Sequence, residues 1–546
     1  MTIEAEYGKM HQTKIYVGQM SDKNMRKGLY PMKTRRLISL LLCMLFIAVC
    51  ALSACGETED TGSVPSSGTT SLEGNAGNSD VDPKYLDSIG RYWPTYSDSM
   101  KDGIIGDRTE IRVLVYNNTI QATYYSEEIE PDMYNTTDAT LNEAVRERNN
   151  VINEKLGITV KAVAVDDVTS HLNNALQANV GDFDIAMPFL TTAASMAQNG
   201  SFYDLRDFEE KGIIDLSAPW YDQNANEALS IQNRLYFTVS DMSIMQKINS
   251  CAMTYNPALI EQIRPGLDLF RMVIDGDWTF DLMMEIGKEF AGDADGNGEL
   301  NYLDNWGFAS GYNDAPYFYL ASGEKFCTKD ENDNPIIAIG GDRSLTVSQK
   351  ILDALQDKTC FIHAQELTSQ GVTDIWGTAL AIFGEERAVF RVSAFSAIKK
   401  LRAYDMDYQI VPMPKIDSEQ SDYYTPAASG YGIVIPIYLS EEDAEYSAYM
   451  IDALSALGKQ YIATAYYDQI LKRKDGLSDE DKSVDMLDLI FDNIVYDVGY
   501  VYDFAGLRSI HQTLMTTSST DIVSNLESIR SAVQAKIDEV IAQYSK

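Results

Sequence analysis

The chain has 546 residues, and its 81 acidic and 44 basic residues give a formal net charge of −37 at pH 7. This balance excludes nucleic acid as a partner, because phosphate contacts require clusters of lysine and arginine. The length exceeds what one hydrophobic core usually supports, so we expect two domains.

The start of the chain has the pattern of a leader followed by a polar connection. Residues 1–31 are polar and show no periodicity, so we interpret them as a misassigned or disordered extension outside the fold. Residues 32–54 have the layout of a signal peptide, with basic residues before an apolar stretch at 37–49. Residues 55–80 follow as a flexible tether, because so polar a segment buries too little surface to offset its ordering entropy.

The end of this leader carries a lipidation signal. Leu52-Ser53-Ala54-Cys55 resembles the lipobox of bacterial lipoproteins, which implies cleavage before Cys55 and a diacylglycerol on its thiol. The alternative is a transmembrane anchor, but the apolar stretch is shorter than the roughly 20 residues that a spanning helix needs. We therefore expect the mature protein on the extracellular face of the cell membrane, held there by its lipid.

Besides the lipidated Cys55, three cysteines stay in the mature chain, namely Cys251, Cys327 and Cys360. They are too few and too scattered for a disulfide framework or a metal knuckle. We expect buried free thiols, because a core of this size needs no covalent support, and a bridge between Cys327 and Cys360 is the alternative. The four histidines form no His-x-x-x-His pair, which argues against a zinc enzyme.

The first ordered elements alternate between strand and helix. From β-branched runs and helical spacing we predict strands at 111–116, 158–165 and 181–187, and helices between Asp138 and Gly157 and at 171–178. Right-handed crossovers between such elements produce a parallel sheet covered by helices, the α/β class. Ligands of open parallel sheets bind beyond the carboxyl ends of the strands. Tyr116, Asn117 and Phe189 should therefore face a cleft.

A series of motifs farther along the chain resembles one protein family. The motifs, in chain order, are Ser201-Phe-Tyr-Asp-Leu205, Pro219-Trp-Tyr-Asp222, Asn233-Arg-Leu-Tyr-Phe-Thr-Val-Ser-Asp241, Met253-Thr-Tyr-Asn-Pro257, Asp277-Trp-Thr-Phe280 and Phe383-Gly-Glu-Glu-Arg-Ala-Val-Phe390. Their order and spacing are similar to the extracellular solute-binding proteins of family 1, the carbohydrate-binding lipoproteins of ABC importers. The resemblance covers roughly residues 109–544.

That resemblance implies a two-lobed, periplasmic-binding-protein-like α/β fold. Each lobe would have a mostly parallel sheet flanked by helices, and a hinge of several strands would join the lobes. The expected lobes are 109–242 plus 390–431, and 247–386 plus 435–546. The expected crossings lie near 240–250, 389–392 and 429–432, and the late helices, including 522–543, would pack onto the second lobe.

The sharpest local motif is an acidic loop at 293–304 with the ligand spacing of an EF-hand. Oxygen-bearing side chains alternate along such a loop so that they converge on one ion, and a glycine allows the sharp turn. The candidate ligands are Asp293, Asp295, Asn297, Glu299, Asn301 and Asp304, with Glu299 acting through its backbone carbonyl. Position 12 holds Asp304 instead of the usual glutamate. We expect a structural Ca²⁺ that braces the loop; an acidic surface turn is the alternative.

Aromatic residues supply the candidate ligand site. A sugar presents apolar ring faces and hydroxyl rims, so its site needs flat rings beside polar side chains. The candidates are Tyr116, Asn117, Trp220 and Asp241 in the first lobe, with Trp376 and Tyr431 from the second lobe and the hinge. The resembled family often has a tryptophan shortly after the motif that ends in Phe390. This chain has Ser393-Ala394-Phe395 there and so lacks that stacking ring.

No catalytic motif accompanies these candidates. The sequence has no Gly-x-Ser-x-Gly elbow, no phosphate-binding glycine loop with a lysine and no plausible Cys–His pair. We therefore expect a monomeric receptor, not an enzyme, which captures a small solute, a carbohydrate or oligosaccharide, and delivers it to an ABC permease. Two alternatives stay open, namely an extracellular lipoprotein hydrolase that acts on polysaccharide and a sensing lipoprotein with the same fold.

Overall fold

The computed structural model describes residues 81–95, 98–119, 124–135, 137–401, 403–427, 430–467 and 480–545. All of them belong to one compact unit that begins at Gly74. The predicted signal peptide, the lipidation residue Cys55 and the tether lie outside the described residues. Within the described residues, no helix is both long and apolar enough to cross a membrane.

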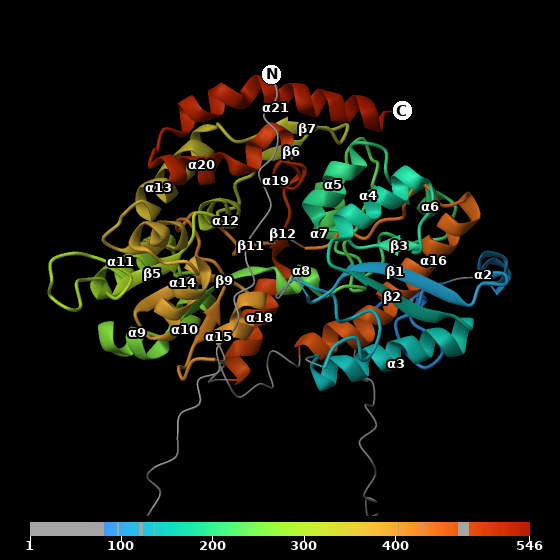
Figure 1. Cartoon of the computed structure of the whole chain (residues 1–546), viewed down its shortest axis with the longest axis horizontal. Helices are drawn as coiled ribbons and strands as arrows, with labels where there is room; N and C mark the ends of the chain where they lie inside the picture. Colours follow the sequence, from blue (N-terminus) through green and yellow to red (C-terminus); the bar gives the residue numbers. More distant parts are fainter. Residues whose placement is uncertain are drawn as a thin grey trace, which may run out of the picture. The chain divides into compact units, whose positions relative to one another are not determined.

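The first lobe is built on a parallel sheet with the strand order β2-β1-β3 (Figure 1). Its strands are β1 (Glu110–Tyr116), β2 (Thr159–Val165) and β3 (Ile185–Ala186). The connecting helices α3 (Ala139–Leu156) and α4 (Val168–Ala178) lie on opposite faces of the sheet. Asp138 caps α3 by accepting a hydrogen bond from the Thr140 N–H at 2.9 Å, and Gly157 ends it at a φ of 71°. The predicted strand–helix order is confirmed.

A later segment of the chain extends this sheet. Val434 bridges Ala186, and Ile433 bridges Thr238. The helices of this lobe are η1 (Pro83–Tyr85), α2 (Asp98–Ile105), α5 (Leu190–Ala197), α6 (Leu205–Glu210), α7 (Gln223–Leu229), α16 (Glu441–Leu457) and the π-helix η3 (Gly458–Ala463). α16 packs against α2, α3 and α6. The prediction that all of 435–546 belongs to the second lobe is therefore wrong for the beginning of that range, which belongs to the first lobe.

The second lobe contains a sheet with the strand order β10-β4-β9-β5-β8. Its strands are β4 (Cys251–Tyr255), β5 (Trp306–Ser310), β8 (Phe361–His363), β9 (Ala388–Ala394) and β10 (Gln409–Val411). β5 runs parallel to β8 and β9, and β4 runs antiparallel to β9 and β10. The assignment of 390–431 to the first lobe is therefore wrong for β9 and β10. Phe390 stacks on Phe308 at 5.4 Å between ring centroids, as in a central strand and not in an exposed connection.

Helices pack around this second sheet. They are α9 (Pro257–Ile263), α10 (Leu269–Asp275), α11 (Phe280–Phe290), α12 (Asp314–Ala321), α13 (Asp342–Leu355), η2 (Ala364–Gln370), α14 (Ile375–Gly384), α15 (Phe395–Leu401) and α18 (Glu480–Asp492). Both α11 and α14 contact β5. Cys251, Cys327 and Cys360 are free and buried, so the expectation of free thiols is confirmed.

The chain leaves the first lobe at Ser240, runs through α8 (Met245–Ile248) and enters β4. Farther along, Ala427 bridges Ser250 at the end of this crossing. Gly430 lies against the first lobe, where its carbonyl accepts a hydrogen bond from the first N–H of α5 at 2.8 Å. The crossing expected near 240–250 agrees with this path. No crossing lies at 389–392, because those residues belong to β9.

The C-terminal elements contact both lobes. They are β12 (Ile494–Val495), α19 (Val498–Tyr502), η4 (Phe504–Ser509), α20 (Ile510–Thr517) and α21 (Ile522–Tyr544). β12 pairs with β11 (Thr425–Pro426). The hairpin of β6 (Cys327–Lys329) and β7 (Pro335–Ile337) lies beside them. α21 packs against α13 and α20, yet the ring of Tyr544 lies 4.6 Å from Tyr236 of the first lobe. Its 23 residues extend about 35 Å at the usual helical rise. The expectation that this helix packs onto the second lobe alone is wrong.

Candidate functional site

Three aromatic rings meet where the strands of the first sheet end. Tyr116 is the last residue of β1, Phe189 follows β3, and Tyr431 lies on the returning segment of the chain. The ring centroid of Tyr116 lies 4.7 Å from that of Phe189 and 5.6 Å from that of Tyr431. The Tyr431 hydroxyl donates a hydrogen bond to the Tyr124 carbonyl at 2.7 Å. The structure thus brings two predicted residues, Tyr116 and Tyr431, together at the carboxyl edge of this sheet. Both are buried, at 3% and 1% exposed, so they support the half-buried ring of Phe189 from behind and do not themselves face a ligand.

Tyr124 connects this cluster with the second lobe. Its ring centroid lies 6.3 Å from that of Phe189 in an edge-to-face arrangement. Its hydroxyl is an electrostatic neighbour of Ser396 and Cys251, and it also interacts with the hydroxyl of Tyr317 on α12. Burial raises the pKa of Tyr124 and that of Tyr317, so both hydroxyls are neutral hydrogen-bonding groups at pH 7.

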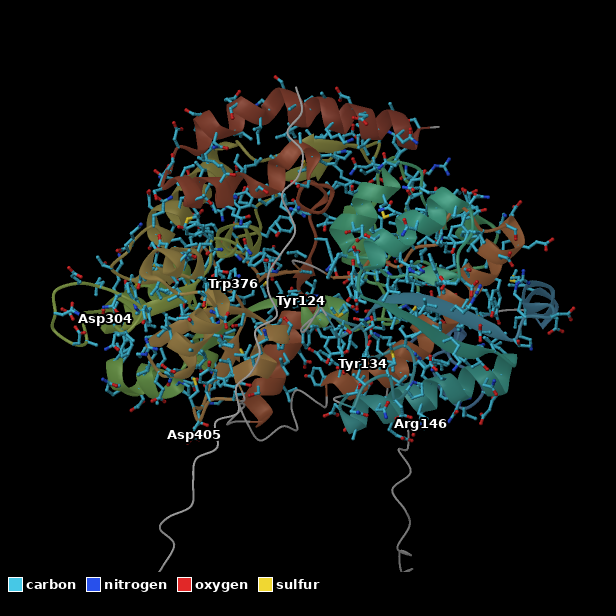
Figure 2. The ribbon with its side chains drawn as sticks, in the orientation of Figure 1. Tyr124, Tyr134, Arg146, Asp304, Trp376 and Asp405 are labelled. Carbon is cyan, nitrogen blue, oxygen red and sulfur yellow. The ribbon has the colours of Figure 1, made fainter. Side chains whose placement is uncertain are left out.

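Trp376 is the exposed ring at the facing edge of the second lobe. It lies in the first turn of α14, whose N-cap Asp374 accepts a hydrogen bond from the Gly377 N–H at 2.9 Å. Its side chain is 46% exposed, and its position on the ribbon is labelled in Figure 2. The indole packs directly on Gly311, just after β5, where a Cβ atom would lie 2.8 Å from Cη2 of the ring. Glycine at this position therefore lets the indole lie flat against the end of β5.

Polar groups lie behind this ring at the ends of β5 and β9. Asp314 begins α12, and its Oδ2 accepts hydrogen bonds from Ser310 Oγ at 2.6 Å and from the Gly311 N–H at 3.0 Å. Burial raises the pKa of the Asp314 carboxyl. Arg391 of β9 is its electrostatic neighbour and donates from Nη1 to the Ala309 carbonyl at 3.2 Å. Sequence reasoning missed both residues, although an arginine within the buried strand β9 was a usable signal.

The other predicted residues occupy different environments. Trp220 is 1% exposed, and its Nε1–H donates to Asp452 Oδ1 at 2.7 Å, so it is a core residue and the expectation that it faces a ligand is wrong. Asp241 forms ion pairs with Lys247 at 2.8 Å and with Lys459 at 3.6 Å, beside the first crossing. These two lysines balance the charge of the Asp241 carboxylate within the protein.

Asn117 lies just beyond the ring cluster. Its Nδ2 donates a hydrogen bond to Asp166 Oδ1 at 2.7 Å, and its backbone N–H donates to the Val165 carbonyl at 2.9 Å. The residue therefore closes the ends of β1 and β2. Its amide oxygen accepts a hydrogen bond from the Thr119 N–H at 2.9 Å, which shapes the start of the following loop.

The acidic loop at 293–304 brings three carboxylates together. Oxygen atoms of Asp293, Asp295 and Asp304 lie within 4.8 Å of one another. Backbone N–H groups orient two of them: those of Gly296 and Gly298 donate to Asp293 at 2.7 Å, and those of Ala294 and Asn301 donate to Asp304 at 2.9 and 2.8 Å. These contacts lower the pKa of Asp293, with the Gly298 N–H as the main cause. The fully buried Asp304 thus closes the loop from position 12.

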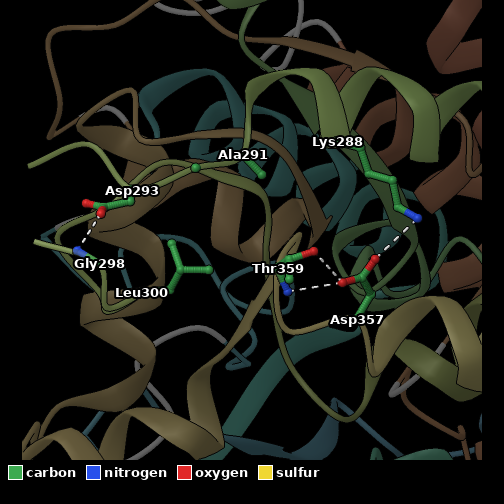
Figure 3. Close-up of a pocket in the computed structure, with 8 residues that line it drawn as sticks. Lys288, Ala291, Asp293, Gly298, Leu300, Asp357 and Thr359 are labelled. Carbon is green, nitrogen blue, oxygen red and sulfur yellow. Dashed lines mark hydrogen bonds and ion pairs between the residues drawn. The ribbon is translucent and has the colours of Figure 1, made fainter. Parts of the chain in front are cut away.

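The remaining candidate ligands of this loop serve mainly as turn residues. Asn297 donates from Nδ2 to Asp295 Oδ2 at 2.9 Å, and its own Oδ1 accepts from the Glu299 N–H at 2.7 Å. A hollow of about 540 Å³ lies beside the loop, as Figure 3 shows, with Leu300 among its lining residues and an ion pair between Lys288 and Asp357 at 3.2 Å along it. The donor set, which is all oxygen, fits a hard cation such as Ca²⁺.

The two carboxyl edges together suit the binding of a ring-shaped polar molecule. One edge offers the half-buried rings of Tyr124 and Phe189, which rest on the buried Tyr116 and Tyr431. The other offers an exposed indole in front of buried charged and hydroxyl groups. Flat rings stack on apolar C–H faces, while the polar groups behind them pair with hydroxyls or other oxygens of the ligand.

Comparison with known proteins identifies a family by sequence. The family model described as bacterial extracellular solute-binding protein matches residues 150–467, which is more than half of the chain. No curated protein matches the chain in sequence.

Comparison with solved structures also finds similar chains. UgpB from Mycobacterium tuberculosis, in complex with glycerophosphocholine, has a TM-score of 0.50 and 15% identity over 79% of this chain and 99% of its own. A cyclo/maltodextrin-binding protein complexed with maltotetraose has a TM-score of 0.49 and 14% identity, covering 79% and 98% of the two chains. An ABC substrate-binding protein from Listeria monocytogenes, in complex with cycloalternan, has a TM-score of 0.48 and 12% identity, covering 80% and 100%. At these identities the likeness concerns the fold alone.

Proposed function

This chain belongs to the bacterial extracellular solute-binding proteins, and from that premise we propose that it captures a carbohydrate or oligosaccharide between its lobes and delivers it to an ABC importer. The observation that carries the proposal is the pair of facing carboxyl edges. Tyr116, Phe189 and Tyr431 cluster on the first, and Trp376 lies over Gly311 on the second.

The mechanism is binding by closure. The solute stacks on the aromatic groups of one lobe, and rotation of the other lobe about the segments that join them brings it over the solute and removes water. The loop that carries Tyr124 is prepared for this contact, because the Ser126 N–H donates to the Tyr116 carbonyl at 3.1 Å and Tyr431 holds the Tyr124 carbonyl. A site fixed in advance loses less entropy on binding.

A thermal-shift screen tests the proposal. Mono- and oligosaccharides are compared with amino acids and peptides, and a carbohydrate should raise the melting temperature. Trp376→Ala should weaken the affinity for that carbohydrate about tenfold or more, because a stacked ring contributes roughly 1.5 kcal/mol or more. Ile274→Ala, which removes a side chain that is 58% exposed on α10 of the same lobe, is the matched control and should leave the affinity unchanged. If only amino acids or peptides stabilise the protein, the carbohydrate proposal fails.

Two rival functions make different predictions. A hydrolase would cleave the oligosaccharide during incubation, whereas a receptor would return it intact. A sensor would bind the same solute without an ABC permease, whereas a transport component would increase solute uptake through its permease and form a complex with it. Turnover of the bound oligosaccharide would refute the receptor proposal.

We also propose that Ca²⁺ occupies the acidic loop as a structural ion. The converging carboxylates of Asp293, Asp295 and Asp304 support it. Millimolar Ca²⁺ should raise the melting temperature, and Asp295→Asn should abolish that rise. Asp330→Asn is the matched control, because Asp330 caps a similar acidic turn through the Asn332 and Asn334 N–H groups. Absence of Ca²⁺ binding by calorimetry would leave an acidic surface turn as the correct interpretation.

The proposed location follows from the leader. The lipobox-like sequence would place a lipid on Cys55, and the tether at 55–80 would let a monomeric receptor dock to its permease from the extracellular face of the membrane. Metabolic labelling with a fatty acid should mark the wild-type protein and not Cys55→Ala, and that variant should be released into the medium. An unlabelled wild-type protein would refute the lipid anchor.

A further inference from the structure

Arg391 stands apart from almost all other arginines of the described residues. Within that part of the chain, every arginine except Arg148 and Arg391 has a carboxylate oxygen within 4.0 Å. Acidic residues outnumber basic ones by nearly two to one, so most arginines readily find a partner. An arginine that lacks one therefore calls for a physical reason.

Arg148 has such a reason within the first lobe. It is fully enclosed, and it donates from Nη2 to the Ile129 carbonyl at 2.8 Å and from Nε to Asn149 Oδ1 at 3.0 Å, while its Nη1 has no partner among the described residues. Glu128 is its electrostatic partner. These contacts fix a loop against α3, so the guanidinium has a structural role.

Arg391 forms fewer hydrogen bonds than Arg148. It is 8% exposed, its one hydrogen bond among the described residues joins Nη1 to the Ala309 carbonyl at 3.2 Å, and its Nε has no partner there. Asp314 is its electrostatic neighbour but forms no ion pair with it, and the Asp314 Oδ2 atom accepts hydrogen bonds from Ser310 and Gly311. A buried guanidinium with an unsatisfied donor costs free energy unless something supplies an acceptor.

The position of Arg391 places that unmet donor at the candidate ligand site. β9 runs parallel to β5 with Ala388 opposite Trp306 and Phe390 opposite Phe308, so Arg391 lies level with Ala309, two residues before the Gly311 that supports the exposed Trp376 ring. Ser396, just after β9, is 3% exposed and lies beside the Tyr124 hydroxyl of the first lobe. The unsatisfied Nε of Arg391 thus lies on the strand that ends at the same carboxyl edge as the indole.

We propose that Arg391 binds an anionic oxygen group of the solute, so that the solute is an acidic sugar that carries a carboxylate or a phosphate. This inference rests on the proposed carbohydrate function and narrows it. A planar guanidinium matches the two oxygens of a carboxylate or phosphate, and charge-assisted hydrogen bonds are stronger than those to neutral hydroxyls. The solute then supplies an acceptor for Arg391 Nε and adds its negative charge to that of Asp314.

Calorimetry with matched sugars tests this inference on the wild-type protein. Three pairs of monosaccharides are compared: galacturonate with galactose, glucuronate with glucose, and glucose 6-phosphate with glucose. The first pair is also compared as oligosaccharides. At least one acid should bind ten times more tightly than its neutral counterpart, and the arm that does so distinguishes carboxylate from phosphate. A neutral sugar that binds as tightly as its acid overturns the inference but leaves the proposed function standing. If no carbohydrate binds, both fail.

Variants locate the effect. Arg391→Gln should reduce the ratio of acid to neutral affinity to about one, and Arg391→Lys should keep part of the ratio because it retains the charge without the fork. Arg271→Gln is the control, since Arg271 lies on α10, is exposed and pairs with Asp275 at 2.6 Å. The unliganded melting temperature is recorded for each variant. If a folded Arg391→Gln or Arg391→Lys protein keeps the full ratio of acid to neutral affinity, Arg391 does not bind the anionic group. If Arg391→Gln does not fold, the ratios measured for Arg391→Lys and for the wild type test the inference.

Discussion

His511 should make the folded protein sensitive to mild acid. It is fully buried in α20, where its ring lies 4.7 Å from Tyr319 and 5.6 Å from Phe326, and its Nε2 lies 2.9 Å from Ser348 Oγ. Burial lowers the pKa of His511 to about 3. The unfolded chain has a histidine pKa near 6.5, so the proton binds the unfolded state first.

The size of the effect follows from that difference. A group whose pKa is depressed by folding contributes stability that is complete above its unfolded pKa and is lost as the pH falls through the folded one. Between pH 7 and pH 5 the unfolded state takes up this proton almost fully while the folded state does not. The free energy of unfolding should therefore fall by about 2 kcal/mol from His511 alone.

Urea unfolding of the wild type and of His511→Gln at pH 7 and pH 5 measures this. The variant should be less stable at pH 7, because glutamine replaces a packed ring, but its loss of stability on acidification should be smaller by about 2 kcal/mol. His171→Gln, a substitution at a partly exposed histidine paired with Asp182, is the control. Equal losses in wild type and His511→Gln would refute the assignment of the effect to burial.

Three other substitutions give distinct results. Trp220→Phe removes the indole donor to Asp452, so urea titration should show a free energy of unfolding lower by about 1–3 kcal/mol. The solute affinity should not change. A loss of affinity without a loss of stability would indicate that Trp220 belongs to the ligand site. Burial raises the pKa of Asp497 to about 6, so this group favours folding below pH 4 and its benefit is lost as the pH rises through 6. Asp497→Asn removes this loss, so between pH 5 and pH 7 the variant should gain about 1 kcal/mol more stability than the wild type, whereas identical pH profiles would contradict the assignment. Tyr431→Phe removes the donor to the Tyr124 carbonyl and should cost about 1 kcal/mol and weaken solute binding by calorimetry; unchanged affinity would show that the Tyr124 loop is held without it.

Short-range patterns predicted the opening of the fold well. The cap at Asp138 and the stop at Gly157 bound α3, and the three strands appear in the expected order. The cysteines are free and buried as expected. These features depend on hydrogen bonds and periodicities within a few turns of chain, which the local sequence encodes directly.

The candidate site could be predicted only in part. Tyr116 and Tyr431 meet, because the end of a parallel strand is a place that topology defines. Trp220 looked equivalent in sequence, yet its partner Asp452 lies more than two hundred residues away on α16 and holds the indole in the core. Arg391 was not selected from the sequence. What distinguishes this residue is that it has no ion-pair partner among the described residues, and no sequence pattern shows that.

By itself the sequence determined the α/β class, the first strands and helices, the acidic loop and the family resemblance. Only the tertiary structure decided which lobe receives each later segment. The runs at 388–394 and 433–435 are both rich in β-branched residues, but the first became a central strand of the second sheet, whereas the second lies in the first lobe and bridges Ala186 and Thr238. The physical reason is that a strand's partner is chosen by the apolar surface that remains to be buried after distant parts of the chain have packed, and that surface exists only in the folded protein.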